Sequence, residues 1–293
     1  MATSATSEQL LVVIDPVARR TDGESVRIAK DVLSAGATTK VCLPEGPEEF
    51  ARALARRGAR RPVVIGDDRA LIRAVALLHR QRELAGCVLS VVPVGSALSL
   101  AGALGVPTGA VAAARAVLDG VARRMDLLVD DSDGVVLGAL RIPPVSLREA
   151  ALEEPLSAAP GGGAGHGSWL RTCQSLVRTL VPARPARDSR DPLDVLPRPR
   201  PARLRIEVDG VMLVDLDQPV EGISVTPCAS GLAEVEVRPV SVGAEASPVV
   251  ARGRRVTVSG ADFRYRADAV VAGPVRTRTW VVREGAWGLT LPG

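Results

Sequence analysis

Two short loops in the sequence combine glycine with polar side chains that could bind a phosphate group. They read Gly66-Asp67-Asp68-Arg69 and Pro93-Val94-Gly95-Ser96. A glycine lets the backbone approach a phosphate closely, and free amides at the start of a helix attract anions. The same residues are also common in plain turns between a strand and a helix. Taken alone, the two loops therefore leave a phosphate site and an ordinary turn equally open.

The segments around these loops predict the elements that would position them. Apolar runs typical of buried strands cover residues 10–14, 62–65 and 89–92, and residues 39–43 are a further strand candidate. Helical spacing covers residues 24–33, 47–59 and 69–79. Such alternation predicts an α/β domain with an open parallel sheet, here over residues 8–150. Ligands of such sheets bind at the carboxyl ends of the strands, which is where both loops lie.

The last third of the chain follows a different pattern. From residue 203 onward apolar and polar residues alternate, and Asp209-Gly210 separates two such runs, as in a hairpin. Further alternating runs cover residues 233–237, 255–258 and 277–282. The alternation predicts an all-β, sandwich-like domain over residues 203–293.

Residues 151–202 separate these two parts and are rich in Pro, Gly, Ala and Arg. Such a composition does not bury enough apolar surface to form its own core. Residues 169–181 form one amphipathic helical island within this insert. The helix is short and weakly basic, so packing onto one of the domains is favoured over lying on a membrane surface.

Composition excludes several classes of protein. The net charge is +4, and no basic stripe is interleaved with aromatic residues, which argues against nucleic-acid binding. Four cysteines and two histidines lie far apart, which argues against a metal site. Asp130-Asp131-Ser132-Asp133-Gly134 lacks the spacing of a calcium loop and is predicted to be a turn between two strands.

One uncharged stretch, residues 84–114, is long enough to suggest a membrane span. Pro93 and Pro107 interrupt it, leaving an inner piece shorter than the roughly 20 residues that a membrane-spanning helix needs. A buried strand, a glycine loop and a helix are expected there instead. The apolar run at residues 10–14 is too short for a signal peptide, so the expected location is cytoplasmic.

Taken in order, these pieces resemble the diacylglycerol kinase catalytic-domain family, the soluble lipid kinases that include bacterial diacylglycerol kinase, sphingosine kinase and ceramide kinase. The family opens with a strand and an Asn-Pro turn, matched by Ile14-Asp15-Pro16. Its GGDGT signature is matched by Gly66-Asp67-Asp68-Arg69-Ala70. Its P-x-G-T-x-N-D-x-A motif is matched by residues 93–101, and Gly105-Val106-Pro107 continues as the family does.

The resemblance continues into the last third and covers nearly the whole chain except the insert. The family's DGxLDV stretch resembles residues 227–235, and its late D-G-E resembles Asp268-Ala269-Val270. It implies a nucleotide site made by Asp15, Gly66, Asp67, Asp68, Arg69, Gly95 and Ser96. It also implies ATP and Mg²⁺ as the cofactors of an active member, a lipid partner, a role in phospholipid metabolism and peripheral contact with a membrane.

Several departures from the family's motifs argue against catalytic activity. Asp67 and Arg69 replace glycines, and the Asp67 carboxylate would repel nucleotide phosphates. Leu98 and Ser99 replace an Asn and an Asp. Ser230 occupies the position where the family has the aspartate that acts as general base, and a serine does not accept a proton at neutral pH as a carboxylate does.

Three hypotheses follow from the sequence. The departures favour an inactive or weak relative, a pseudokinase that keeps the fold and has a binding or regulatory role. The first alternative is an active ATP-dependent lipid kinase. The second is a generic α/β plus β protein without kinase ancestry.

Overall fold

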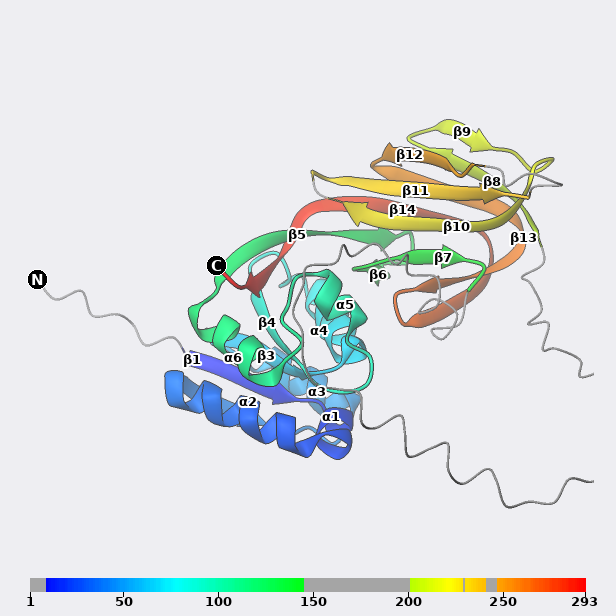
Figure 1. Cartoon of the computed structure of the whole chain (residues 1–293). Coiled ribbons are helices and arrows are strands. Elements are labelled where there is room, and N and C mark those ends of the chain that lie inside the picture. The colour runs from blue at the N-terminus through cyan, green and yellow to red at the C-terminus, as the bar shows by residue number, and fades with distance from the viewer. Residues whose placement is uncertain (1–8, 145–200, 229, 241–246) are drawn as a thin grey trace, which may run out of the picture. The chain divides into compact units, whose positions relative to one another are not determined.

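The computed structural model describes residues 9–144, 201–228, 230–240 and 247–293 (Figure 1). The described residues all belong to one compact unit. Within the described residues, fourteen strands join one hydrogen-bonded sheet, whose main path runs β12-β11-β10-β7-β13-β14-β4-β3-β1-β2. The chain is therefore a mixed α/β structure with a large β-rich part.

The parallel part of the sheet contains the four strands that the sequence predicts. They are β1 (Gln9–Ile14), β2 (Thr38–Cys42), β3 (Arg61–Gly66) and β4 (Val88–Pro93). They pair in the order β4-β3-β1-β2, all parallel. Strand β2 has only β1 as a neighbour, so it forms the edge of the sheet at this end.

Six helices accompany these strands in the described part of the chain. They are α1 (Pro16–Thr21), α2 (Gly23–Gly36), α3 (Pro47–Ala55), α4 (Asp68–Arg80), α5 (Ser99–Ala103) and α6 (Ala110–Asp119). Leu11 and Val13 of β1 face a core formed with α3, α4 and α5. Leu10 and Val12 face a second core, formed with α2 and α6. Apolar residues on both faces explain why β1 is a continuous apolar run.

The described residues of the β-rich part form ten strands, which pair antiparallel with one another. They are β5 (Val121–Asp130), β6 (Val135–Val136), β7 (Leu140–Ile142), β8 (Ala202–Val208), β9 (Val211–Val214), β10 (Pro219–Cys228), β11 (Leu232–Pro239), β12 (Val249–Gly253), β13 (Arg255–Ala267) and β14 (Val270–Leu291). Its core is a separate cluster that includes Trp280 and Tyr265, whose rings meet edge to face at 5.2 Å. Alternating burial along β11 matches the period-two pattern of its sequence.

Strand β14 links the two parts of the sheet. It pairs antiparallel with β13 and β5, and near its end Gly288 and Leu289 pair in parallel with Val88 and Leu89 of β4. Figure 1 shows β14 running from the β-rich part to β4. Because strands of both parts share one sheet, the boundaries of a separate α/β domain (8–150) and all-β domain (203–293) stay predictions.

Several smaller expectations are met. The uncharged stretch 84–114 contains β4, α5 and the first half of α6. In the described residues no helix combines the length and apolarity needed to span a membrane. Residues 130–134 form the turn between β5 and β6, as predicted. The insert and its predicted helix at 169–181 lie outside the described residues, apart from 201–202.

Candidate nucleotide-binding site at the carboxyl ends of the strands

The loops that follow β1, β3 and β4 lie side by side. Ile14 pairs with Ile65, and Gly66 pairs with Pro93. Beyond the strands, the Asp15 amide donates to the Ile65 carbonyl at 2.9 Å and the Val94 amide donates to the Gly66 carbonyl at 3.0 Å. The fold thus places Asp15, the Gly66 loop and the Gly95 loop along one edge, which we call the carboxyl edge.

Asp67 caps the start of α4 with its side-chain carboxylate. Its Oδ1 accepts hydrogen bonds from the amides of Arg69 at 3.1 Å and Ala70 at 3.2 Å. Asp is among the preferred residues at this position, because it satisfies amides that have no partner within the helix. These are the amides that a phosphate at the start of α4 would use.

Asp68 is buried and fixes the start of the next helix. Its carboxylate accepts from the amides of Leu100 at 2.9 Å and Ala101 at 3.0 Å, both in the first turn of α5. Burial raises the pKa of the Asp68 carboxyl above its ordinary value, and the neighbouring Asp67 charge adds to this rise. The two amides oppose it, because they favour the charged form. Asp68 therefore holds the Gly95 loop in place.

Asp15 has the same function at the first helix. It is buried, and its Oδ1 accepts from the Val17 amide at 2.8 Å at the start of α1. Its Oδ2 forms an ion pair with Arg73 of α4, also at 2.8 Å. Three carboxylates thus bind the amides at three helix starts along the carboxyl edge.

The two glycines of the loops are explained by close packing around these carboxylates. Gly95 has a φ of +131°, which disfavours any residue with a side chain, and a Cβ there would lie 3.1 Å from the Asp67 Cβ. A Cβ at Gly66 would lie 3.0 Å from the Asp15 Cβ and 2.6 Å from the Ala70 Cβ. The glycines therefore allow the carboxylates to approach the helix starts.

Arg69 and Ser96 complete the set of predicted binding residues, and their side chains are exposed. Within the described residues, neither side chain makes a hydrogen bond or ion pair. Arg69 is the cation of this set nearest in sequence to the Asp67 carboxylate, and its charge is available to solvent.

Ser230 lies in the turn between β10 and β11, with a φ of +73°. The next residue, Gly231, donates its amide to Asp126 Oδ2 of β5 at 2.8 Å. In the described part of the chain, no hydrogen bond or ion pair connects Ser230 with the carboxyl edge. Its assignment to the catalytic centre stays a prediction.

A part-buried carboxylate that the predicted set of site residues leaves out lies beside this edge. Asp268 follows β13 and accepts three amides, from Leu137 at 2.8 Å, Gly138 at 2.8 Å and Ala139 at 3.0 Å. Burial raises the pKa of the Asp268 carboxyl, these amides oppose the rise, and the Asp68 charge adds to it. The resemblance of residues 268–270 to the D-G-E motif was the sequence signal that pointed to this residue.

The described residues contain no group of three or more His, Cys, Asp or Glu side chains that could hold a metal ion. The carboxylates of the carboxyl edge instead accept backbone amides or pair with Arg73. A magnesium ion would have to be held partly by the phosphates of a bound nucleotide, as is usual for this ion.

Comparison with known proteins agrees with this geometry. Residues 9–129 match the family described as the diacylglycerol kinase catalytic domain, so this part of the chain belongs to that family. The matched segment runs from β1 to the end of β5 and includes the whole carboxyl edge. No curated protein matches the sequence.

Solved structures extend the similarity in fold to the whole chain. A chain assigned as a diacylglycerol kinase from Bacillus anthracis str. Sterne has a TM-score of 0.67 and 12% identity, with 98% of each chain covered. A crystal structure described as a diacylglycerol kinase from the same organism has a TM-score of 0.66 and 11% identity, covering 98% of this chain and 97% of that one. The chain therefore shares its overall fold with these structures.

Proposed function

We propose that this lipid-kinase-family protein is a pseudokinase, in which the nucleotide phosphate site is closed by the chain's own carboxylates. It keeps the kinase fold for a binding or regulatory role and transfers phosphate weakly or not at all. The observation that carries the proposal is the hydrogen bonding of Asp67 to the Arg69 and Ala70 amides. An intramolecular carboxylate already fills the place that a phosphate would take.

A nucleotide would meet two costs at this edge. It would first have to displace the Asp67 carboxylate from the start of α4, a cap that contributes about 1 kcal/mol. It would then place its phosphates beside that carboxylate. Two like unit charges 4 Å apart repel by about 1 kcal/mol in bulk water and about 4 kcal/mol at the effective dielectric near a protein surface. Arg69 offsets part of this cost with its exposed positive charge.

The remaining departures act in the same direction. Leu98 and Ser99 stand where the family has polar contacts, and the Leu100 and Ala101 amides that follow are bound by Asp68. If Ser230 takes the place of the general base, the lipid hydroxyl has no carboxylate there to accept its proton. Each change weakens phosphate binding or proton transfer.

An active ATP-dependent lipid kinase is the second candidate, and Asp268 is the observation that favours it. Its raised pKa and its proximity to Asp68 are typical of functional carboxyl groups. In this reading Asp268 would accept the proton of the lipid hydroxyl, while ATP and Mg²⁺ would supply the phosphoryl group.

Calorimetric titration with ATP and ADP, with and without Mg²⁺, tests the proposal. We expect no binding tighter than millimolar by the wild-type chain, and no transfer of radiolabelled phosphate to diacylglycerol in detergent micelles. Tight, Mg²⁺-dependent binding together with phosphate transfer would overturn the pseudokinase assignment and establish the second candidate.

Two substitutions at residue 67 separate the effect of the negative charge of Asp67 from the effect of its side chain occupying the start of α4. Asp67→Asn keeps the cap but removes the charge, whereas Asp67→Gly removes the carboxylate at a stability cost of only a few tenths of a kcal/mol. We expect Asp67→Gly to tighten nucleotide binding about fivefold or more, with Asp67→Asn between it and wild type. Equal binding by all three proteins would show that Asp67 does not close the site.

A further inference from the structure

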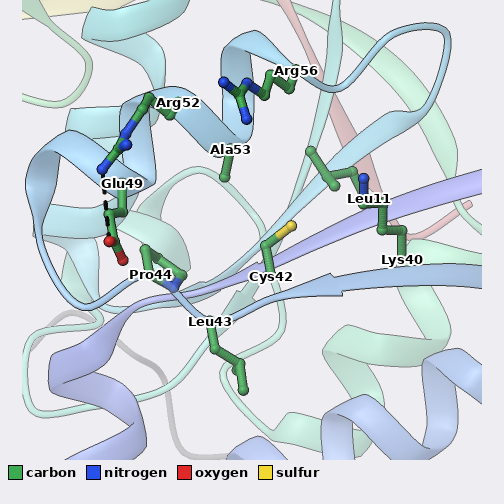
Figure 2. Close-up of a pocket in the computed structure, with 9 residues that line it drawn as sticks. All are labelled: Leu11, Lys40, Cys42, Leu43, Pro44, Glu49, Arg52, Ala53 and Arg56. Atoms are coloured by element: carbon green, nitrogen blue, oxygen red, sulfur yellow. Dashed lines mark ion pairs between the residues drawn. The ribbon is translucent and has the colours of Figure 1, made fainter.

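A pocket of about 340 Å³ lies at the edge of the parallel sheet, beside β2 and α3 (Figure 2). We call it the β2 pocket, and it is lined by Leu11, Lys40, Cys42, Leu43, Pro44, Glu49, Arg52, Ala53 and Arg56. Its volume is at the lower end of the roughly 300–1,000 Å³ that small-molecule sites occupy. None of the residues of the carboxyl edge lines it.

The pocket exists because α3 covers the edge strand incompletely. Phe50 and Leu54 of α3 are fully buried in the core below the sheet. On the adjacent face of the helix, Ala53 has a short side chain and leaves space between α3 and the strands β1 and β2. Figure 2 shows Ala53 directed from α3 toward the strands, where Leu11 and Cys42 form the apolar floor.

Positive charge surrounds this apolar floor. Lys40 comes from β2, while Arg52 and Arg56 come from α3 and its carboxyl end. Arg52 forms an ion pair with Glu49 at 3.6 Å. The side chains of Lys40 and Arg56 make no hydrogen bond or ion pair with any described residue. The three cations and one carboxylate leave the pocket with a net charge of +2.

We propose that the β2 pocket binds a small organic anion, a phosphate or carboxylate that carries a short apolar group. Lys40 and Arg56 would bind the anionic group, because both cations lack an internal partner. Leu11, Cys42 and Ala53 would contact the apolar group, and the aliphatic stems of Lys40 and Arg56 extend this apolar surface. A lysine on an edge strand also discourages pairing with another sheet, but that role needs neither the two arginines nor a cavity.

This proposal does not depend on the proposed function. The β2 pocket and the carboxyl edge share no residue, and the substitution at Asp67 that tests one leaves the other unchanged. A chain that bound nucleotide tightly would still possess the β2 pocket.

Chemical footprinting of lysine provides a direct test, because the chain contains only two lysines, Lys30 and Lys40. Lys30 lies on α2, which packs on the opposite face of the sheet, and serves as an internal control. An amine-acylating reagent would be applied to the full chain with hexyl phosphate, inorganic phosphate, hexanol or vesicles that contain an anionic lipid. Mass spectrometry would give the acylation rate of each lysine.

We expect hexyl phosphate to slow acylation of Lys40 in a saturable way and to leave Lys30 unchanged. Inorganic phosphate should need about tenfold higher concentration, because burying about two methylene groups strengthens binding by that factor. Equal protection of both lysines would overturn the proposal. So would protection by hexanol, protection by inorganic phosphate at the same concentration, or protection only by vesicles.

A pair of matched substitutions identifies the cation that binds. Arg56→Gln removes one charge from the pocket. Arg115→Gln removes an exposed charge from α6 on the other face of the sheet, and this charge has no partner among the described residues. Arg56→Gln should weaken hexyl phosphate binding about fivefold, and Arg115→Gln should leave it unchanged. Equal affinities for the two variants would exclude the β2 pocket as the binding site.

Discussion

Three carboxylates bind the helix starts at the carboxyl edge, whereas three cations line the β2 pocket on the same parallel sheet. At the carboxyl edge, Asp15, Asp67 and Asp68 accept the amides that α1, α4 and α5 leave without helical partners. In the β2 pocket, Lys40 and Arg56 keep their charges unpaired among the described residues. In this type of sheet ligands usually bind at the carboxyl ends of the strands, but here the chain's own carboxylates accept the amides of that edge. The unpaired cations that an anion could contact lie instead in the β2 pocket.

The comparison implies that carboxylates of the carboxyl edge stabilise the fold, and Asp68 should matter most. Asp68→Ala would leave the Leu100 and Ala101 amides without an acceptor in a buried place. We expect a loss of about 2 to 3 kcal/mol in the free energy of unfolding, measured by urea denaturation. Asp68→Asn retains one acceptor oxygen and should lose about half as much. A loss below 0.5 kcal/mol for Asp68→Ala would contradict this role, since exposed positions change stability by about that amount.

The ion pair behind the carboxyl edge should give the next largest effect. Arg73→Ala would leave the buried Asp15 carboxylate without its cation and would remove a contact between Arg73 and the Phe50 ring, 5.5 Å from the guanidinium carbon. Because Arg73 is partly exposed, we expect a loss of about 2 kcal/mol rather than the larger cost of breaking a fully buried pair.

A double-mutant cycle would isolate the charge interaction. In an Asp15→Asn background, Arg73→Ala should cost about 1 kcal/mol less than in the wild-type chain, because the unpaired charge is absent. Equal costs in both backgrounds would mean that Arg73 stabilises α4 by packing alone.

Asp268 should make the stability depend on pH. Its pKa is raised by burial in the folded chain, so its contribution to stability is complete below the ordinary carboxyl pKa. This contribution is lost as the pH rises through the folded value. Asp68, whose charge contributes to the raised pKa of Asp268, itself has a raised pKa.

The variant Asp268→Asn makes this dependence measurable. It keeps one acceptor oxygen and cannot ionise, and we expect it to be about 1 to 2 kcal/mol less stable than wild type near pH 4. The difference should shrink as the pH rises, because only the wild-type chain then acquires a buried charge. A difference that grows between about pH 4 and pH 8 would contradict the raised pKa.

The smallest effect is expected in the β2 pocket. Lys40→Gln and Arg56→Gln remove exposed cations that have no internal partner, so the free energy of unfolding should change by less than about 0.5 kcal/mol. Thermal unfolding of each variant would check this. A loss above 1 kcal/mol would show that these cations support the fold, and the contrast with the carboxyl edge would disappear.

Much of the parallel sheet could be predicted from the sequence, because strands buried on both faces appear as continuous apolar runs. The residue ranges 10–14, 62–65 and 89–92 lie within β1, β3 and β4. The glycine loops could also be placed at the carboxyl ends of strands, because each loop directly follows a predicted strand. The Asp-Pro pair at residues 15–16 indicates the end of β1, because a proline cannot continue the hydrogen bonds of a strand. The short helix α1 that begins at Pro16 was not predicted.

The hydrogen bonds between the carboxylates of the carboxyl edge and the amides at the helix starts could not be predicted in the same way. Whether Asp67 points at its own helix or at a ligand depends on its rotamer and backbone, which the sequence does not encode locally. Asp268 bonds to amides about 130 residues earlier in the chain, a pairing that depends on the tertiary fold. The β2 pocket likewise depends on how α3 lies over the sheet, and a sequence shows only that Ala53 is small.

Strand β14 has a consequence for the order in which the chain can fold. Strand β4 appears early in synthesis, yet its second partner, at Gly288 and Leu289, is made almost 200 residues later. Until then β4 is an unpaired edge rich in apolar residues, and such edges can pair with other chains. Release of the nascent chain before β14 is complete should therefore favour aggregation, and the α/β part made alone should need a chaperone to remain dispersed.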